Sequence, residues 1–488
     1  MSVTTLGNLI GGHARAPSEG AYLDVFEPAT GGVFARCPAS TPADVDDAVA
    51  AANSAAPAWA ATPLDVRAAI LHRLADLVEG ELESFAAAES KDNGKPLSLA
   101  CNLDIPRAVA NLRFFAAAIT QWSSEAHPMP GGTLNYTLRQ PLGAVACISP
   151  WNLPLYLFTW KIAPALAAGN TVVAKPSEVT PFTAWMLGEL AAKAGLPDGV
   201  LNIVHGHGAD IGDHLVGHPG IKAVSFTGST RTGRSIAAIT APLFRKTSLE
   251  LGGKNATIVF DDARIDDARL DTIVRSGFAN QGEICLCGSR LLVQRSIYDG
   301  FRQRYLERVR ALTVGDPLHG DTDLGALVSA AHHGKVTDAI ATARAEGGTV
   351  ACGGSAVQLD GRCAGGWFIE PTVIEGLGAD TATNRQEIFG PVVTLIPFED
   401  EADAIALTNT SDYGLAASLW TDDLSRAHRV SAQLATGIVW VNCWMLRDLR
   451  TPFGGARQSG LGREGGVEAL RFFSEAKNIC IAMESPHA

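Results

Sequence analysis

The feature that most constrains the fold is a regular alternation of two kinds of segment between residues 143 and 253. Short apolar segments at 143–149, 170–175, 200–206, 222–228 and 246–253 are rich in β-branched residues and predict strands. Helix-like segments lie between them, near 156–168, 180–194, 209–216 and 230–239. Such an alternation is typical of a parallel sheet with helices on both faces. We therefore predict a doubly wound α/β domain of the kind that binds nucleotides.

A second strand-rich region follows residue 250, where we place a boundary. Its predicted strands are 255–260, 289–294, 391–398, 416–421 and 437–443. Residues 41–118 have helical apolar spacing and are predicted to cover one face of the first sheet. Segments 132–140 and 478–483 alternate like strands outside both sheets, so they are expected to pair with each other or with another subunit. We expect an oligomer.

Composition and charge exclude several classes of partner. The 488 residues are 47% hydrophobic and 18% charged, which fits a globular protein. A net charge of −12 without a long basic run argues against nucleic acid as a partner. Pro141, Pro150 and Pro154 interrupt the uncharged stretch 140–160, which predicts buried core rather than a membrane span. The first residues do not resemble a secretory signal, so we expect a cytoplasmic location.

Cysteine usage leaves one candidate nucleophile. The nine cysteines include no CxxC pair, so most are expected to be reduced and buried. Cys285, in FANQGEICLCGSR, follows a Gly-containing turn and precedes a predicted strand, although by itself this segment favours a packed thiol. On a strand Cys287 would face the same side as Cys285, but a disulfide between them would be strained, and we predict plain packing for Cys287.

Two polar residues follow predicted strands and suggest chemistry. Glu250 precedes Gly252 and Gly253 at the carboxyl edge of the predicted sheet, where open α/β sheets bind ligands. Asn152, in SPWNLP, lies in a proline-bounded turn and offers an amide donor to a developing oxyanion. Each is weak evidence alone, because asparagine is common in turns and strand-end acids are often solvated.

The signals for a cofactor and for a metal are also weak in isolation. Gly228 and Gly233, in FTGSTRTG, lie where a strand leads into a helix, so a pyrophosphate can approach the backbone closely. Lys175 and Glu178, in KPSE, are available to bond ribose hydroxyls, but the pattern is not GxGxxG. The histidine-rich run 205–218 has no acidic or cysteine cluster in register, which predicts loop histidines and no metal site.

Together these motifs occur in the order of the aldehyde dehydrogenase superfamily, which the chain resembles over nearly its whole length. The motifs that carry the resemblance are PWNLP, KPSE, FTGS, ELGGK, NQGEIC, EIFGPV, NCWMLRDLRTPFGG and GLGRE. The resemblance implies an α/β subunit that oxidises an aldehyde to an acid. Its expected parts are a Rossmann-like NAD-binding domain (1–122 and 142–250), an α/β catalytic domain (251–457) and a β-hairpin oligomerisation segment (123–141 and 458–488).

The resemblance also implies roles for single residues. Cys285 would attack the aldehyde, Asn152 and the Cys285 backbone N–H would hold the oxyanion, and Glu250 would activate the hydrolytic water. A free thiol is only about 3% thiolate at pH 7, so the site must activate Cys285. Lys161 and Glu464 match positions with supporting roles near the site.

The implied cofactor is NAD, because Glu178 would repel the 2′-phosphate of NADP. The residues implied to bind it are Ser149, Trp151, Lys175, Ser177, Glu178, Gly208, Gly228, Ser229, Leu251, Glu387 and Phe389.

Two arginines suggest the substrate class. Arg107 and Arg447 fall where many relatives that take apolar aldehydes have an uncharged side chain, which favours a carboxylate-bearing semialdehyde held bidentately. Arg450 is a weaker candidate for the same role. The alternative is that the arginines pair with nearby acids such as Asp104 or Asp448.

The segments around these arginines resemble most the members of the superfamily that act on 2-aminomuconic or 2-hydroxymuconic semialdehyde. A broad-specificity enzyme for aliphatic or betaine-type aldehydes is an alternative, and so is a non-catalytic member of the fold. The sequence does not distinguish an amino from a hydroxyl substituent, or a homodimer from a homotetramer.

Overall fold

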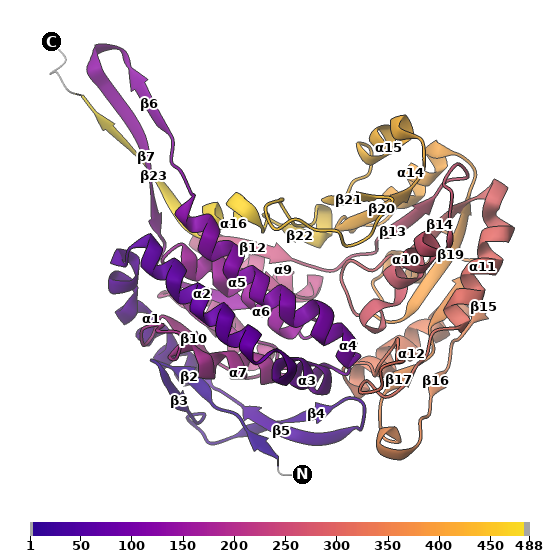
Figure 1. The fold of residues 1–488 in the computed structure, drawn as a ribbon, viewed down its shortest axis with the longest axis horizontal. Coiled ribbons are helices and arrows are strands. Elements are labelled where there is room, and N and C mark those ends of the chain that lie inside the picture. The colour runs from indigo at the N-terminus through magenta and orange to yellow at the C-terminus, as the bar shows by residue number, and fades with distance from the viewer. Residues whose placement is uncertain (1–2, 483–488) are drawn as a thin grey trace.

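The structure, a computed structural model, describes residues 3–482. Its strands form two main sheets and a projecting arm (Figure 1). The first sheet has the strand order β22-β12-β11-β8-β9-β10-β2-β3. Its parallel strands are β8 (Ala144–Ile148), β9 (Thr171–Lys175), β10 (Leu201–Ile203), β11 (Ala223–Thr227) and β12 (Lys246–Glu250). All five lie inside the segments that the alternation predicts.

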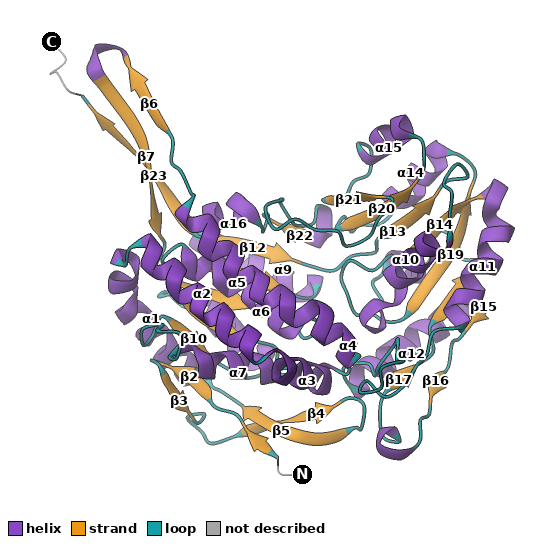
Figure 2. Cartoon of the chain, viewed as in Figure 1, coloured by secondary structure: helices purple, strands orange, loops and turns teal. Residues whose placement is uncertain are grey.

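Helices cover both faces of this sheet, which explains why its strands are continuously apolar (Figure 2). Alternate residues of β8 face two different cores: Val145 packs in one with Cys147, and Ala146 in the other with Ile148. The first core is built with α2 (Leu64–Gly80), α3 (Leu82–Asn93), α5 (Ile105–Thr120), α6 (Pro154–Ala167) and α7 (Phe182–Ala191). The second is built with α1 (Pro42–Ala61), α8 (Gly208–Gly217) and α9 (Thr230–Thr240). The prediction that 41–118 covers one face is therefore wrong for α1.

The second sheet begins after residue 250 and has the strand order β15-β18-β19-β14-β13-β20-β21. Its predicted strands are β13 (Ala256–Val259), β14 (Arg290–Gln294), β19 (Val392–Phe398), β20 (Ala416–Trp420) and β21 (Ile438–Val441). Two further strands, β15 (Thr349–Cys352) and β18 (Thr372–Glu375), extend it. The helices between them are α10 (Asp267–Phe278), α11 (Tyr298–Arg310), α12 (Ala330–Ala345), α14 (Glu401–Asn409) and α15 (Leu424–Ser431).

Several short elements were not predicted. The N-terminal region adds β2 (Asn8–Ile10) and β3 (His13–Arg15) to the first sheet and forms a separate sheet from β1 (Thr4–Thr5), β4 (Tyr22–Glu27) and β5 (Gly32–Pro38). A small ribbon pairs β16 (Ala356–Val357) with β17 (Phe368–Ile369). The remaining helices are α4 (Leu97–Leu99), a π-helical turn (Ala100–Asp104), α13 (Ala382–Arg385) and α16 (Gly466–Phe472).

The arm consists of β6 (Ala126–Met129), β7 (Thr133–Pro141) and β23 (Ser474–Ile481), and it projects away from both sheets (Figure 1). Strands β7 and β23 pair antiparallel, so the two unplaced segments of the sequence meet within one chain. The end of the predicted bridging segment, residues 483–488, lies outside the described residues. Within that same predicted segment, β22 (Gly460–Leu461) pairs with β12 and joins the first sheet instead. None of the helices in 3–482 is long and apolar enough to cross a membrane.

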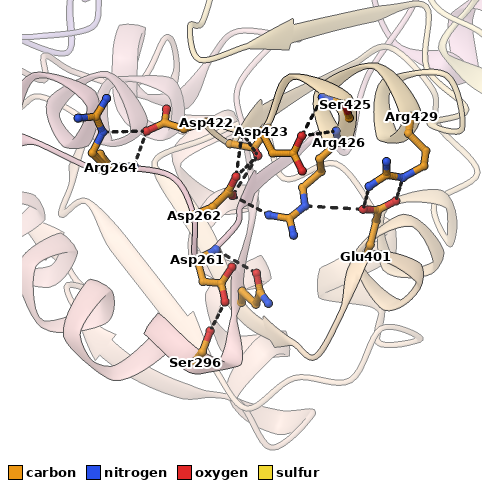
Figure 3. A network of polar contacts seen from close by, with 12 residues as sticks. Asp261, Asp262, Arg264, Ser296, Glu401, Asp422, Asp423, Ser425, Arg426 and Arg429 are labelled. Carbon is orange, nitrogen blue, oxygen red and sulfur yellow. Dashed lines mark hydrogen bonds and ion pairs between the residues drawn. The ribbon is translucent and has the colours of Figure 1, made fainter.

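The carboxyl edge of the second sheet is occupied by ion pairs (Figure 3). Asp262 follows β13 and bonds Arg426, with 2.7 Å between Nη1 and Oδ1. Arg429 pairs with Glu401 at 2.6 Å, and Glu401 also approaches Arg426. Because these acids are already partnered, this edge is not where a ligand site is expected.

Candidate active site

A cavity of about 300 Å³ lies between the two main sheets. The loops after β8, β11 and β12 form one wall, and the segments before β14 and β19 form the opposite wall. The carboxyl edge of the first sheet therefore faces the amino edge of the second. The lining residues are Pro150, Trp151, Asn152, Thr227, Gly228, Ser229, Leu251, Gly252, Cys285, His332, Lys335, Glu387, Ile388 and Phe389.

Cys285 is partly exposed in this cavity, in a turn between a short helical segment (Ala279–Gly282) and β14. Both Asn280 and Gln281, just before the turn, have positive φ, and the Asn280 side chain donates to the Glu283 carbonyl oxygen at 3.3 Å. Among the described residues, no acceptor bonds the Cys285 backbone N–H, which leaves it available to a ligand oxygen. Burial, together with the Glu387 and Glu250 carboxyl groups, raises the pKa of the Cys285 thiol.

Cys287 is not on a strand, which corrects the geometry assumed for the pair. Residues 285–287 form a turn, and Cys287 is buried with Ile284 and Trp444 in a small apolar cluster. Both thiols are free. The contacts are those of a packed side chain.

Asn152 is held firmly beside Cys285. Its Nδ2 donates to the Glu283 carbonyl oxygen at 2.9 Å, two residues before the thiol. Its own carbonyl oxygen accepts from Lys95 Nζ at 3.1 Å and from Asn280 Nδ2 at 3.2 Å. One N–H of the Asn152 amide remains for a ligand, because an amide nitrogen carries two.

Glu250 ends β12 and is buried, and within the described part of the chain neither of its carboxyl oxygens has a hydrogen-bond partner. Burial raises the pKa of Glu250 well above its usual range, Glu464 raises it further, and Lys161 opposes the shift. Lys161 Nζ bonds Glu464 Oε1 at 2.8 Å, so the two predicted supporting residues form a pair beside Glu250. A methyl group on Gly454 would come within 2.5 Å of Glu250 Oε1, which shows how closely the backbone approaches this carboxyl.

The start of α9 suits a phosphate. Gly228 precedes the helix, and Ser229 caps it by accepting the Thr232 backbone N–H at 3.2 Å. A helix N-terminus attracts anionic groups through its free N–H groups. Ser149 Oγ and Thr227 Oγ1 are both buried nearby and have no hydrogen-bond partner among the residues that the structure describes, as expected where a polar ligand completes the site. The residues present therefore fit a dinucleotide.

The remaining predicted cofactor residues extend from this cavity along the sheet edge. Lys175 Nζ and Glu178 Oε2 pair at 3.1 Å, and Ser177 Oγ accepts the Val179 backbone N–H at 3.2 Å. Gly208 begins α8, directly after His207, whose Nδ1 lies 3.5 Å from Glu178 Oε1.

Glu387 and Phe389 form the far side of the cavity. Glu387 Oε1 accepts the Gly253 backbone N–H at 2.8 Å, and burial raises the pKa of Glu387 to about 7. Phe389 has a φ of 62°, and its ring meets Trp151 edge-on with 5.1 Å between centroids. Leu251 lies between this side and α9, in contact with Gly233.

Arg107 and Arg447 line an open hollow together with Arg450, Phe114, Leu446, Asp448 and Leu449. Arg447 lies between two rings, with its guanidinium carbon 4.3 Å from the centre of Trp160 and 3.7 Å from that of Phe453. Nε and Nη2 of both Arg107 and Arg447 are buried, and no residue of 3–482 forms a hydrogen bond with them. Arg447 also acts on the reacting groups, because its charge opposes the upward pKa shift of both Cys285 and Glu250.

The two acids that offered these arginines an alternative partner are each paired with another cation, although the charge of Asp448 still acts on Arg107. Asp104 pairs with Lys95, and Asp448 pairs with Arg450 at 2.6 Å. Arg450 is exposed, so it differs from Arg107 and Arg447 in both burial and pairing.

The structure corrects the prediction for one residue of the histidine-rich run. His214 lies within α8 rather than in a loop and contacts Asp46 at 2.6 Å, with His218 Nε2 3.2 Å from the same oxygen. Nδ1 of His218 accepts the Gly220 backbone N–H at 3.0 Å, so in the neutral ring Nε2 carries the proton and cannot ligate a metal.

A family model described as the aldehyde dehydrogenase family matches residues 15–479. The chain belongs to the aldehyde dehydrogenase family. It is 49% identical over 479 residues to a 2-aminomuconic semialdehyde dehydrogenase of Bos taurus, covering 98% of each chain. It is 46% identical over 482 residues to a 2-hydroxymuconic semialdehyde dehydrogenase of Pseudomonas sp. (strain CF600), covering 98% of this chain and 99% of the relative. A crystal structure of PnpE in complex with nicotinamide adenine dinucleotide matches with a TM-score of 0.96 and 39% identity over 99% of both chains.

These matches confirm the resemblance and the predicted fold. The site includes residues that were not predicted, among them Thr227, His332 and Lys335 in the cavity lining and Tyr156 beside Arg447. His332 lies in the first turn of α12, where its Nε2 contacts the Phe389 carbonyl oxygen at 2.6 Å. Tyr156 accepts an N–H of Arg447 at 3.2 Å, and its ring lies beneath Arg107. Local sequence carries no signal for them, because each resembles an ordinary helix or strand-end residue until the chain is folded.

Proposed function

We propose that this protein catalyses NAD-dependent oxidation of 2-aminomuconate 6-semialdehyde to 2-aminomuconate. The names of the relatives support the substrate. The observation that carries the proposal is the pair of arginines, Arg107 and Arg447, which share one hollow and whose buried Nε and Nη2 groups have no partner among residues 3–482. The charge of Arg447 also reaches Cys285. A buried cation without a partner is costly, and a bidentate carboxylate satisfies it.

The first half of the reaction follows from the residues around Cys285. The thiol sulfur bonds the aldehyde carbon, and its proton passes to the Glu250 carboxylate, because burial raises the pKa of Glu250 and makes that carboxylate a stronger proton acceptor. The carbonyl oxygen becomes an oxyanion, which the free N–H of Asn152 and the backbone N–H of Cys285 are placed to bind. The product of this step is a thiohemiacetal on Cys285.

NAD, when bound, supplies the acceptor for the hydride that leaves the thiohemiacetal carbon. We assign its phosphates to Gly228 and Ser229 at the start of α9, its adenosine ribose to Lys175 and Glu178, and its nicotinamide half to Glu387 and Phe389. Ser149, Trp151, Ser177, Gly208 and Leu251 complete the walls.

The second half hydrolyses the thioester. Loss of the hydride would leave a thioester on Cys285, and Glu250 must release the thiol proton before it can act again. Glu250 then takes a proton from water, the hydroxide attacks the thioester carbon, and the C–S bond breaks to release the acid and the Cys285 sulfur. The pair of Lys161 and Glu464 lies beside Glu250 and supplies a polar route for the proton that Glu250 must release.

We further propose that the two main sheets act as the cofactor and catalytic domains within the predicted boundaries, and that the arm joins subunits into a homodimer or homotetramer. Its exposed apolar residues, Met129, Leu134, Leu138 and Ile481, support this role. We place the enzyme in the cytoplasm, where its nine free cysteines stay reduced.

The proposal is tested by NADH formation with enzymatically generated 2-aminomuconic semialdehyde, with 2-hydroxymuconic semialdehyde and an aliphatic aldehyde run in parallel. We expect the highest kcat/KM with the aminomuconic substrate. A higher kcat/KM with the hydroxymuconic substrate would instead assign the enzyme the activity for which the Pseudomonas relative is named. Preference for the aliphatic aldehyde would contradict a role for the arginines.

A variant pair tests the arginines directly. Arg447→Ala is expected to lower kcat/KM for the carboxylated substrate by about 10- to 150-fold, because a charge-assisted hydrogen bond contributes about 1.5–3 kcal/mol. Arg450→Ala is the matched control, since Arg450 is exposed and already paired with Asp448, and it should change kcat/KM by less than about threefold. Equal effects of the two variants would contradict the assignment.

A further inference from the structure

Lys95 is a buried cation that the reaction scheme does not yet use. It follows the C-terminus of α3, where Gly94 turns the chain with a φ of 89°. Its side chain has no exposed surface, and its ammonium group forms an ion pair with Asp104 and lies 4.0 Å from Glu89 Oε1. A buried lysine of this kind needs its charge and its N–H groups satisfied, and Asp104 supplies the charge.

One donor of Lys95 is directed elsewhere. Nζ lies 3.1 Å from the carbonyl oxygen of Asn152, and this contact joins α3 to the loop that follows β8. The same oxygen accepts from Asn280 Nδ2 at 3.2 Å and from Asn93 Nδ2 at 3.5 Å. Of these three donors only Lys95 carries a charge, so its bond is the strongest that this carbonyl receives.

The contact bears on the orientation of Asn152. The main chain of Asn152 is fixed at its carbonyl, and the side chain is fixed by the bond from Nδ2 to the Glu283 carbonyl oxygen. Because both the carbonyl oxygen and Nδ2 of Asn152 are held, the second N–H of Nδ2 points in one direction. Without the Lys95 bond the Asn152 carbonyl oxygen keeps only two neutral donors, from Asn280 and Asn93, so the peptide is held less firmly and the direction of the amide is less well fixed.

We propose that Lys95 is a positioning residue, which holds the Asn152 carbonyl so that the Asn152 amide faces the carbonyl oxygen of an aldehyde at Cys285. The proposal rests on the role assigned to Asn152 above. Lys95 is not among the residues that line the cavity, and its hydrogen bond to the site is the one to the Asn152 carbonyl oxygen.

The test is a double-mutant cycle measured as kcat per folded active site, with the sites counted by covalent titration of Cys285. Lys95→Met is expected to lower kcat/KM about 10- to 100-fold with aliphatic and carboxylated aldehydes alike, because misplacing one oxyanion donor has an effect of this size. The dissociation constant of NAD should stay within about twofold. Lys95→Arg should recover part of the loss, since it restores a charged donor.

The cycle separates positioning from stability. In an Asn152→Ala background Lys95→Met should have no further effect on kcat/KM, since the group that it aims is gone. Equal effects of Lys95→Met in both backgrounds, or unchanged kcat per site in the single variant, would overturn the proposal. Full activity of Asn152→Ala would instead overturn the assigned role of Asn152, and with it the proposed oxyanion site.

Two further variants test whether a loss of activity reflects misfolding rather than a misplaced Asn152 amide. Lys95→Met leaves Asp104 buried and unpaired, so Lys95→Met/Asp104→Asn removes both charges and should show the same loss of kcat/KM in a better-folded protein. Arg67→Met is the matched control, because Arg67 is another buried cation that donates to backbone carbonyls, those of Ala167 and Thr62, away from the cavity. It should lower the Tm without changing kcat per folded site.

Discussion

Three ionisable residues at the site, Cys285, Glu250 and Glu387, lie in surroundings that raise their pKa, and their protonation sets how the activity responds to pH. Burial raises the pKa of Cys285, of Glu250 and of Glu387, and for the first two neighbouring carboxyl groups add to the effect. Arg447 opposes the shift at Cys285 and Glu250. The same arginine that is proposed to bind substrate therefore also helps to ionise the nucleophile and the base.

The first prediction concerns the pH profile of kcat/KM. Cys285 and Glu250 must each lose a proton to act, and a raised pKa moves that loss to higher pH. We expect kcat/KM to rise with pH between 6 and 9, by up to about tenfold per pH unit where one proton must leave. Arg447→Ala should shift the profile further to the alkaline side. A profile that is flat or falling over this range would contradict the ionisation states proposed here.

The second prediction concerns Glu387, whose pKa is raised to about 7. The carboxylate accepts ribose hydroxyl protons better than the neutral acid does, so the KM for NAD should be higher at pH 6 than at pH 8. With a pKa near 7 the ionised fraction changes about tenfold between these values, which bounds the effect. In Glu387→Gln the KM for NAD should be independent of pH. A pH-dependent KM that persists in this variant would assign the titration to another group.

At the scale of elements, short loops at strand ends carry the chemistry, and the regular elements hold them in place. Asn152, Thr227 and Glu250 follow three neighbouring parallel strands, so they meet at one edge of the first sheet. The arm is different, because its strands contribute no residue to the cavity lining and expose apolar side chains.

The arm gives the third prediction. Replacing Leu138 by Asp places a charge on an exposed apolar strand and should shift the subunits toward a smaller assembly, as measured by size-exclusion chromatography with light scattering. Leu424→Asp is the control, because Leu424 is more exposed than Leu138 but lies on α15, far along the chain from the arm. An unchanged assembly in Leu138→Asp, or an equal change in the control, would exclude the arm as the subunit contact.

At the scale of the whole molecule, the cavity lies between the two main sheets, so a bound cofactor contacts residues from both. A ligand that binds only the folded state stabilises it by about 2.7 kcal/mol at a concentration 100 times its dissociation constant. The fourth prediction is a rise in Tm of a few degrees with saturating NAD, measured by differential scanning fluorimetry. NADP at the same concentration should give a smaller rise, because Glu178 repels its 2′-phosphate. Equal shifts would contradict the assignment of Glu178 to the adenosine ribose.

Much of the regular fold was predictable because the buried strands are continuous apolar segments between helices. β8, β9 and β11 are buried at every residue, and a continuous apolar segment of this kind can be recognised in the sequence without knowledge of its neighbours in the fold. β1, β2 and β3 were missed because each has two or three residues, too few to show a period. The packing of α1 on the far face was missed because its apolar spacing specifies a buried side, not the partner that buries it.

By itself the sequence determined the order of strands and helices, the motifs of an aldehyde dehydrogenase, and the residue types available for nucleophile, base and cofactor. These follow from local periodicity and from the chemistry of single side chains. Only the tertiary structure decided that Asp104 pairs with Lys95 while Arg107 and Arg447 keep free N–H groups, and that Lys95 bonds the Asn152 carbonyl. Burial, pKa and pairing depend on groups far apart in the chain, and folding alone brings those groups within bonding distance.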